Sequence, residues 1–136
     1  MDKLKILIVE DDFLSRSFLT KMVKEYGDVE IAIDGVEAVE AVKRAHEAKA
    51  PYTIIFLDIM MPRKDGQTAL REIRELEEKA GMSALENCKV VMTTALGDAK
   101  NVMGAFGSQC DAYLTKPFSK KSIDDQFRKL IPDFFK

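Results

Sequence analysis

The sequence predicts an α/β fold with a doubly wound parallel sheet. Short apolar runs alternate with amphipathic helical patterns along its 136 residues. The runs place apolar residues at successive positions, which is typical of strands that are buried on both faces of a parallel sheet. Five runs alternating with five helical patterns favour right-handed crossovers that leave helices on both faces. The predicted strands are residues 4–9, 29–33, 52–57, 89–94 and 112–114.

Each predicted helix carries apolar residues three or four positions apart on one face. Residues 77–87 fit either a longer third helix or a loop around Gly81. In residues 97–107, interior glycines lower helix stability by about 1 kcal/mol each, which indicates a loosely held fourth helix or close packing on the sheet. The apolar helix positions are Leu14, Phe18, Met22, Leu19, Val23 and Tyr26; Val39, Val42 and Ala45; Leu70, Ile73 and Leu76; Val102, Met103 and Phe106; and Ile123, Phe127, Leu130 and Ile131.

The composition excludes several classes of protein. Lys and Arg number 21 against 23 Asp and Glu, a net charge of −2, which argues against a large basic surface for nucleic acid. No uncharged stretch approaches the roughly 18 residues of a membrane span, and no signal-peptide pattern is present, so we expect a cytoplasmic protein. Cys88 and Cys110 are expected to be free thiols. The length predicts one domain over residues 1–136, with no effector domain.

Chemically active side chains follow four of the predicted strands. Glu10 and Asp11 follow the first strand, Asp58 follows the third, Thr94 ends the fourth, and Lys116 comes after the fifth. The carboxyl ends of parallel strands meet at one edge, where ligands of this fold class bind. Carboxylates held close together repel one another unless a cation joins them. A hard cation with few protein oxygens and a shell completed by water and phosphate describes Mg²⁺.

A simpler alternative is that the acids only cap helices. That alternative is reasonable for Asp12, which directly precedes a predicted helix. It fails for Asp58, because Ile59, Met60 and Met61 follow it with no immediate helix to cap. The acids therefore predict a site as well as caps.

Four separated motifs together resemble the receiver domain of two-component response regulators. The resemblance extends over residues 5–131 and implies a flavodoxin-like sheet with the strand order 2-1-3-4-5. The motifs are Ile6-Leu7-Ile8-Val9-Glu10-Asp11-Asp12, Leu57-Asp58-Ile59-Met60-Met61-Pro62 with Asp65-Gly66, Thr94-Ala95, and Tyr113-Leu114-Thr115-Lys116-Pro117-Phe118.

The resemblance implies a phosphoacceptor and a Mg²⁺ site. Asp58 matches the phosphoryl-accepting aspartate and also ligates the metal. Asp11 would be a direct ligand, and Glu10 would act through water. The backbone carbonyl of Met60 would complete the metal site, so the identity of that side chain does not matter for binding.

The resemblance also implies a switch. Thr94 matches the hydroxyl that binds the phosphoryl group, and Lys116 matches the cation that pairs with it. Tyr113 matches the aromatic residue whose rotamer reports the state of Thr94. The Lys116-Pro117 peptide would be cis. Phosphorylation of Asp58 adds about one negative charge to a site that Mg²⁺ and Lys116 otherwise balance. An inward movement of Thr94 would supply a donor to the new oxygens.

Met60 and Leu96 are expected to tune the lifetime of the phosphorylated state. They lie two residues after Asp58 and Thr94, and in the resemblance they flank the path of the hydrolytic water. Both are apolar, so neither can orient that water by hydrogen bonding. The alternative is that the two side chains only pack against each other.

The resemblance implies a phosphorylation-controlled signalling switch. His46, the single histidine, is expected at the surface, so a sensor histidine kinase or a histidine phosphotransfer protein would supply the phosphoryl group. Helix four, strand five and helix five would face an unknown downstream target. The protein would be a monomer or a phosphorylation-dependent dimer. Phe134 and Phe135 either flank this face or pack against their own domain.

Other functions compete with this interpretation. A phosphorelay intermediate would pass the phosphoryl group on, and a phosphorylation-independent interaction module would not use it. A phosphatase with an aspartate nucleophile would place a second acid where this sequence has Met60. We therefore expect a phosphoacceptor and not an enzyme, with only self-phosphorylation from small phosphodonors and autodephosphorylation.

The sequence departs from the family pattern at two places. Gln109, followed by Cys110, stands where a small residue usually closes helix four. The stretch between Asp58 and Thr94 is also several residues longer than is usual, an excess that we assign to residues 77–87. Neither departure touches the chemically active residues.

Overall fold

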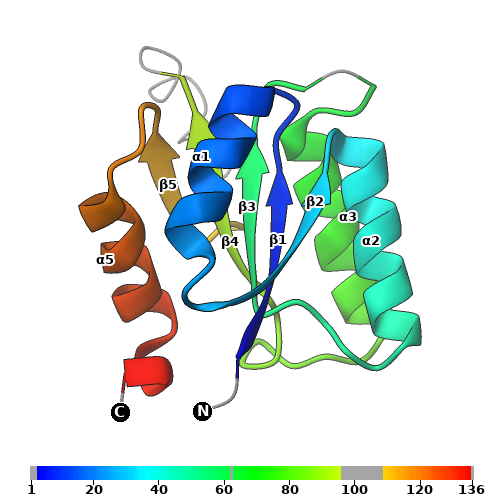
Figure 1. Ribbon diagram of the computed structural model, residues 1–136. Coiled ribbons are helices and arrows are strands. Elements are labelled where there is room, and N and C mark those ends of the chain that lie inside the picture. Colours follow the sequence, from blue (N-terminus) through cyan, green and yellow to red (C-terminus); the bar gives the residue numbers. More distant parts are fainter. Residues whose placement is uncertain (1–2, 62, 96–108, 136) are drawn as a thin grey trace.

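The computed structural model describes residues 3–61, 63–95 and 109–135, which form a three-layer α/β fold (Figure 1). The elements are β1 Leu4–Val9, α1 Phe13–Val23, β2 Gly27–Ala32, α2 Gly35–Glu47, β3 Ile54–Asp58, α3 Gly66–Lys79, β4 Lys89–Thr94, β5 Ala112–Thr115, α5 Lys120–Leu130 and the 3₁₀ turn η1 Pro132–Phe135. The five parallel strands lie in the order β2-β1-β3-β4-β5. This confirms the predicted fold class and strand order. The predicted fourth helix, with Val102, Met103 and Phe106, lies outside the described residues.

The two faces of the sheet are covered by different helices. Helices α1 and α5 lie on one face, and α2 and α3 on the other (Figure 1). The strands point their carboxyl ends to one edge, which we call the carboxyl edge. Both ends of the chain lie at the opposite, amino edge (Figure 1).

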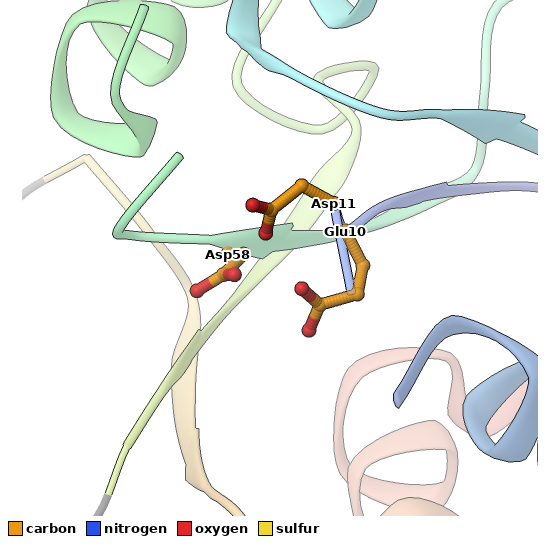
Figure 2. Close-up of side chains that lie close together, drawn as sticks. All are labelled: Glu10, Asp11 and Asp58. Carbon is orange, nitrogen blue, oxygen red and sulfur yellow. The ribbon is translucent and has the colours of Figure 1, made fainter. Parts of the chain in front are cut away.

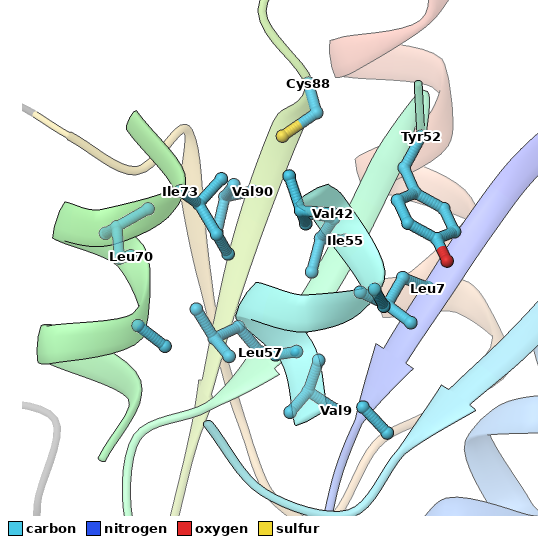
Figure 3. Packing of buried hydrophobic residues seen from close by; sticks show 14 of the residues in the cluster. Leu7, Val9, Val42, Tyr52, Ile55, Leu57, Leu70, Ile73, Cys88 and Val90 are labelled. Atoms are coloured by element: carbon cyan, nitrogen blue, oxygen red, sulfur yellow. The ribbon is translucent and has the colours of Figure 1, made fainter. Parts of the chain in front are cut away.

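Successive residues of the central strands enter two separate cores, because side chains alternate across a strand. Leu7 and Ile55 pack under α2 and α3, as Figure 3 shows, whereas Ile6 and Phe56 pack under α1 and α5. None of these four side chains is more than 1% exposed. Burial of one such side chain contributes about 1.5–3 kcal/mol. The strands therefore form a well-packed platform for the residues at their ends.

Strand β2 differs from the prediction of a strand buried on both faces. Ile31 is 42% exposed and Ile33 is 45% exposed. The strand lies at the edge of the sheet and pairs with β1. Its start is fixed by Gly27, since a Cβ there would lie 2.0 Å from the Leu4 carbonyl oxygen. An edge position, which apolar content alone does not reveal, explains the difference.

Helix α1 buries only part of the predicted apolar surface. Leu19, Met22 and Val23 face the core as expected. Leu14 and Phe18, however, are 75% and 55% exposed. The helix is rotated so that the stripe through Leu19 and Val23 contacts the sheet. An apolar stripe therefore remains on the outer surface of α1.

In the stretch of residues 77–87, α3 continues through Lys79 and a loop follows, so the loop alternative is confirmed from residue 80 onward. Helix α3 ends at Lys79, and Gly81 adopts φ +71° in the turn that follows. Glu77 is buried, and its Oε2 accepts a 2.7 Å hydrogen bond from the backbone of Cys88. Cys88 and Cys110 are both free, as expected, and burial raises the pKa of the Cys88 thiol.

Arg74 of α3 joins this loop to the start of β5. Its Nε donates to the Gln109 carbonyl oxygen at 2.8 Å, and its Nη2 donates to Asp111 Oδ2 at 3.2 Å. Gln109 is one of the residues that depart from the family pattern, and its backbone carbonyl accepts this hydrogen bond from Arg74. The expected end of helix four lies outside the described residues.

The carboxyl-terminal aromatic residues pack against their own domain. Tyr26 stacks on Phe127 with ring centroids 3.9 Å apart. Phe134 and Phe135 contact the same Tyr26 ring, with centroid distances of 5.6 and 6.0 Å. The alternative of tail packing is therefore confirmed.

Candidate functional site

Three carboxylates converge at the carboxyl edge of the sheet (Figure 2). Glu10 and Asp11 directly follow β1, and Asp58 is the last residue of β3. Because Val9 pairs with Leu57, the residues that follow them come side by side on neighbouring strands. One carboxylate oxygen from each lies within 4.8 Å of the other two, with Glu10 and Asp58 buried and Asp11 exposed. The structure thus brings together the three acids that the sequence predicted to lie close to one another.

Lys116 reaches into this cluster from the end of β5. Its Nζ lies 2.5 Å from Glu10 Oε1 and 3.4 Å from Asp58 Oδ2. Its backbone N–H donates to the Thr94 carbonyl oxygen at 2.8 Å, and the following peptide bond to Pro117 is cis, as expected. The ammonium group therefore touches the acids of both central strands.

Burial and charge act in opposite directions at this site. Burial raises the pKa of Glu10, and the nearby Asp58 carboxylate adds to this effect, while Lys116 opposes it. Burial lowers the pKa of Lys116, but the hydrogen bond to Glu10 and the charge of Asp58 outweigh burial, so its pKa lies above the usual value. With all groups ionised, three negative charges face one positive charge. The surplus and the all-oxygen donor set fit a divalent hard cation such as Mg²⁺.

The Asp58 carboxylate is held by groups on two sides. The Met60 backbone N–H donates to Asp58 Oδ1 at 3.3 Å, and Lys116 donates to Oδ2. The chain after Asp58 crosses toward β4, where the Ile59 N–H donates to the Thr93 carbonyl oxygen at 3.0 Å. Met60 itself is 68% exposed. Its backbone thus lies beside the acids while its side chain points away from the core.

Thr94 ends β4 next to this group. The pairing of Asp58 with Thr93 places Thr94 one position beyond Asp58 on the neighbouring strand. The threonine is buried, and its hydroxyl donates to the Ala95 carbonyl oxygen at 3.4 Å. Tyr113, on β5, is half-buried, and burial together with Cys110 raises its pKa. Leu96, the second predicted lifetime residue, lies outside the described residues.

Asp12 does not join the cluster. Its Oδ2 accepts a 2.8 Å hydrogen bond from the Ser15 N–H as the N-cap of α1, which confirms the helix-cap alternative for this residue. Arg16, which sequence reasoning missed, donates from Nη1 to the Glu10 carbonyl oxygen at 3.1 Å. The sequence offered little to single out Arg16, since an arginine in the first turns of an amphipathic helix is common.

The fold and the site define a doubly wound α/β protein whose carboxyl edge holds a cluster of three carboxylates and one lysine. The chain belongs to the response regulator receiver domain family, whose model matches residues 6–128. Members of this family are signalling phosphoacceptors and not enzymes in the ordinary sense. The resemblance stated from the sequence motifs is thus confirmed.

The chain is similar to the chemotaxis protein CheY of Halobacterium salinarum, with 31% identity over 93% of this chain and 96% of that protein. It is also similar to the magnesium-containing receiver domain of a sensor histidine kinase from Pseudomonas aeruginosa (TM-score 0.75, 26% identity, 96% and 99% of the two chains). A third similar structure is the receiver domain of Ssk1 in its co-crystal with the histidine phosphotransfer protein Ypd1 of Saccharomyces cerevisiae (TM-score 0.78, 25% identity, 94% and 88%).

The chain spans only 12% of the length of two rice relatives named probable histidine kinase 2, which are 33% identical over 90% of this chain. Receiver domains thus occur both as most of a protein and as a small part of one. Within the described residues, no helix is long and apolar enough to cross a bilayer.

Proposed function

We propose that this chain is a phosphorylation-controlled switch that accepts a phosphoryl group on Asp58. The observation that carries the proposal is the buried Asp58 carboxylate with Lys116 on one oxygen and a backbone N–H on the other. Attack by one Asp58 oxygen on phosphorus forms the acyl phosphate. The bond to the donor breaks, and the donor's nitrogen or oxygen keeps that electron pair.

Glu10, Asp11, Asp58 and the Met60 carbonyl would hold Mg²⁺, whose charge would neutralise the phosphoryl oxygens during transfer. Lys116 pairs with an Asp58 oxygen before transfer and would pair with a phosphoryl oxygen afterwards. Thr94 would then turn toward the new oxygens, and Tyr113 would follow it. The proposed output face comprises residues 97–107, β5 and α5, directed to a target not yet known.

The exposed stripe of α1 is the proposed docking surface for the phosphodonor, a sensor histidine kinase or a histidine phosphotransfer protein. Leu14 and Phe18 line an apolar groove of about 270 Å³ whose far wall is Lys116, Pro117 and Phe118. The groove therefore ends at a residue that contacts Asp58. A donor histidine from a partner seated in this groove would lie next to the phosphoacceptor. The co-crystal of Ypd1 with a similar receiver domain supports a partner of this kind.

The test uses acetyl phosphate and intact-mass measurement. Wild-type protein should gain one phosphoryl group with Mg²⁺ present and none with a chelator, and it should lose that group on standing. Asp58→Asn should gain none under either condition. A phosphorylated Asp58→Asn protein, or no phosphorylation of the wild type, would contradict the proposal. The second result would favour a phosphorylation-independent interaction module.

A further inference from the structure

An ion pair outside the acidic cluster joins the loop after Asp58 to the start of α2. Arg63 Nε donates to Asp34 Oδ2 at 2.6 Å. Arg63 lies in the loop between β3 and α3, and Asp34 is the N-cap of α2. The two residues are 29 positions apart in the chain. The pair therefore connects two loops of the carboxyl edge.

Both partners are held in defined positions. Asp34 is buried, and its second oxygen accepts a 2.9 Å hydrogen bond from the Glu37 N–H. Arg63 has a φ of 66°, a backbone conformation that residues other than glycine rarely adopt. Such a conformation persists where surrounding contacts fix it. The contact with Asp34 is one that does so.

A second contact beside the ion pair makes the connection tight. The Gly35 N–H donates to the Lys64 carbonyl oxygen at 3.1 Å. A Cβ at Gly35 would lie 2.2 Å from that oxygen, so only glycine allows this approach. The loop is thus fixed to α2 through two consecutive residues, Arg63 and Lys64.

The other end of the same loop contacts the phosphoacceptor. Met60 donates its N–H to Asp58 Oδ1. The Gly66 N–H donates to the Ile59 carbonyl oxygen at 2.9 Å, which closes the base of the loop. Between these points, the described residues 61 and 63–65 belong to no strand or helix. Arg63 and Lys64, three and four residues after Met60, are the described residues of this loop that contact the start of α2.

We infer that the Asp34–Arg63 ion pair is a positioning pair that holds the Met60 backbone against the phosphoacceptor site. The inference rests on the proposed function, because it concerns the same metal and phosphoryl site. Neither residue touches the acidic cluster, so both act through the loop. Groups that orient metal ligands in this way affect metal affinity although they do not bind the metal.

The experiment compares Arg63→Gln, Asp34→Asn and the double variant with the wild type. Asn remains a good N-cap, so Asp34→Asn keeps the cap of α2 while it removes the charge. Mg²⁺ affinity is measured by titration calorimetry, and backbone amide exchange of residues 60, 61, 63 and 64 by NMR in the metal-free protein. Each single variant should bind Mg²⁺ about tenfold more weakly, and the double variant should be no weaker than the singles. Exchange at Met60 should become faster.

Lys121→Gln is the matched control, because it removes a cation that is paired with Asp125 at 3.1 Å and far more exposed. It should change neither Mg²⁺ affinity nor exchange at Met60. A purely structural role of the pair would lower the free energy of unfolding in urea but leave the Mg²⁺ affinity of the folded protein unchanged. That result, or additive losses in the double variant, overturns the inference.

The outcome is separable from that of the proposed function. If wild-type protein binds Mg²⁺ but acetyl phosphate does not modify Asp58, the proposed function fails while the Mg²⁺ comparison still tests the pair. If wild-type protein is phosphorylated and Arg63→Gln binds Mg²⁺ equally well, only the positioning role fails.

Discussion

Lys116 and Glu10 form a 2.5 Å ion pair across the carboxyl edge, although their strands are separated by β3 and β4 in the sheet. The lysine side chain therefore passes over the end of β4 and contacts Asp58 as well. One ammonium group thus holds two buried carboxylates that would otherwise repel each other.

Replacement of Lys116 should separate metal binding from phosphorylation. In Lys116→Ala, one positive charge leaves the site, so Mg²⁺ should bind more tightly than in the wild type. Phosphorylation by acetyl phosphate should slow by about 100-fold, because the group that pairs with developing phosphoryl charge is lost. Calorimetry and intact-mass kinetics measure the two effects. Lys121→Ala, at an exposed position, is the control, and weaker Mg²⁺ binding in Lys116→Ala would contradict the assigned role.

Asp11 and Asp12 are adjacent acids with different expected roles. Asp11→Ala should weaken Mg²⁺ binding by at least about tenfold, since it removes a carboxylate of the cluster. Asp12→Ala should leave Mg²⁺ affinity nearly unchanged and lower the urea midpoint, because Asp12 caps α1. Calorimetry measures the Mg²⁺ affinity of both variants, and urea unfolding measures their stability. Equal losses of Mg²⁺ affinity would show that the distinction is wrong.

The phosphorylated state should be long-lived because Met60 and Leu96 cannot orient a hydrolytic water. We expect Met60→Asn and Leu96→Glu, singly and more so together, to accelerate loss of the phosphoryl group. Mg²⁺ affinity should change little in Met60→Asn, because the proposed ligand at this position is the backbone oxygen. The measurement is the decay of phosphorylated protein after removal of the phosphodonor. Unchanged or slower decay in the double variant refutes this account.

The exposed stripe on α1 should matter for protein phosphodonors only. Leu14→Ser with Phe18→Ser should change the free energy of unfolding by less than about 1 kcal/mol, since both side chains are largely exposed. The double variant should accept phosphoryl groups from acetyl phosphate at the wild-type rate but poorly from the kinase or phosphotransfer protein that labels the wild type. Leu19→Ala, in the buried stripe, should instead cost about 2–5 kcal/mol of stability. If the double variant accepts phosphoryl groups from both donors at the wild-type rates, the docking surface lies elsewhere.

All three tyrosines of the chain should resist ionisation in the folded state. Burial raises the pKa of Tyr26 and of Tyr52 to about 12, and it also raises that of Tyr113. A raised pKa contributes stability that is fully present below the unfolded value of about 10 and is lost as pH rises toward the folded value. Stability should therefore fall above pH 10. Phenolate absorbance of the folded protein should rise only well above that pH, with urea-unfolded protein as the control. A folded-state midpoint near 10 would contradict the predicted burial effect.

Much of the fold could be predicted because local patterns determine it. The predicted bounds of β1 and β4 match the structure, since each strand has a largely apolar sequence, LKILIV and KVVMTT, with polar residues at or directly after its carboxyl end. The acidic cluster followed from the same pattern together with parallel strand pairing. The exposed Ile31 could not be predicted, because apolar content does not show whether a strand lies at an edge.

Two other features depend on tertiary context. Leu14 and Phe18 have the spacing of a core stripe, yet the rotation of α1 against the sheet leaves them outside. Asp34 and Arg63 come from separate loops, so no periodicity or motif links them. Their pairing depends on how α2 and the loop after β3 pack together. Sequence patterns thus revealed the residues of the candidate site more readily than the ion pair between the two loops.

The location of both chain ends at the amino edge has a practical consequence for tethering. A flexible linker at either end, fixed to a solid support or joined to a fluorescent domain, would lead away from Asp58 and from the groove along α1. The acidic cluster would then face the bulk solution with its approach unobstructed. Immobilised protein should therefore be suitable for measuring the arrival and departure of cations, phosphodonors and binding partners directly.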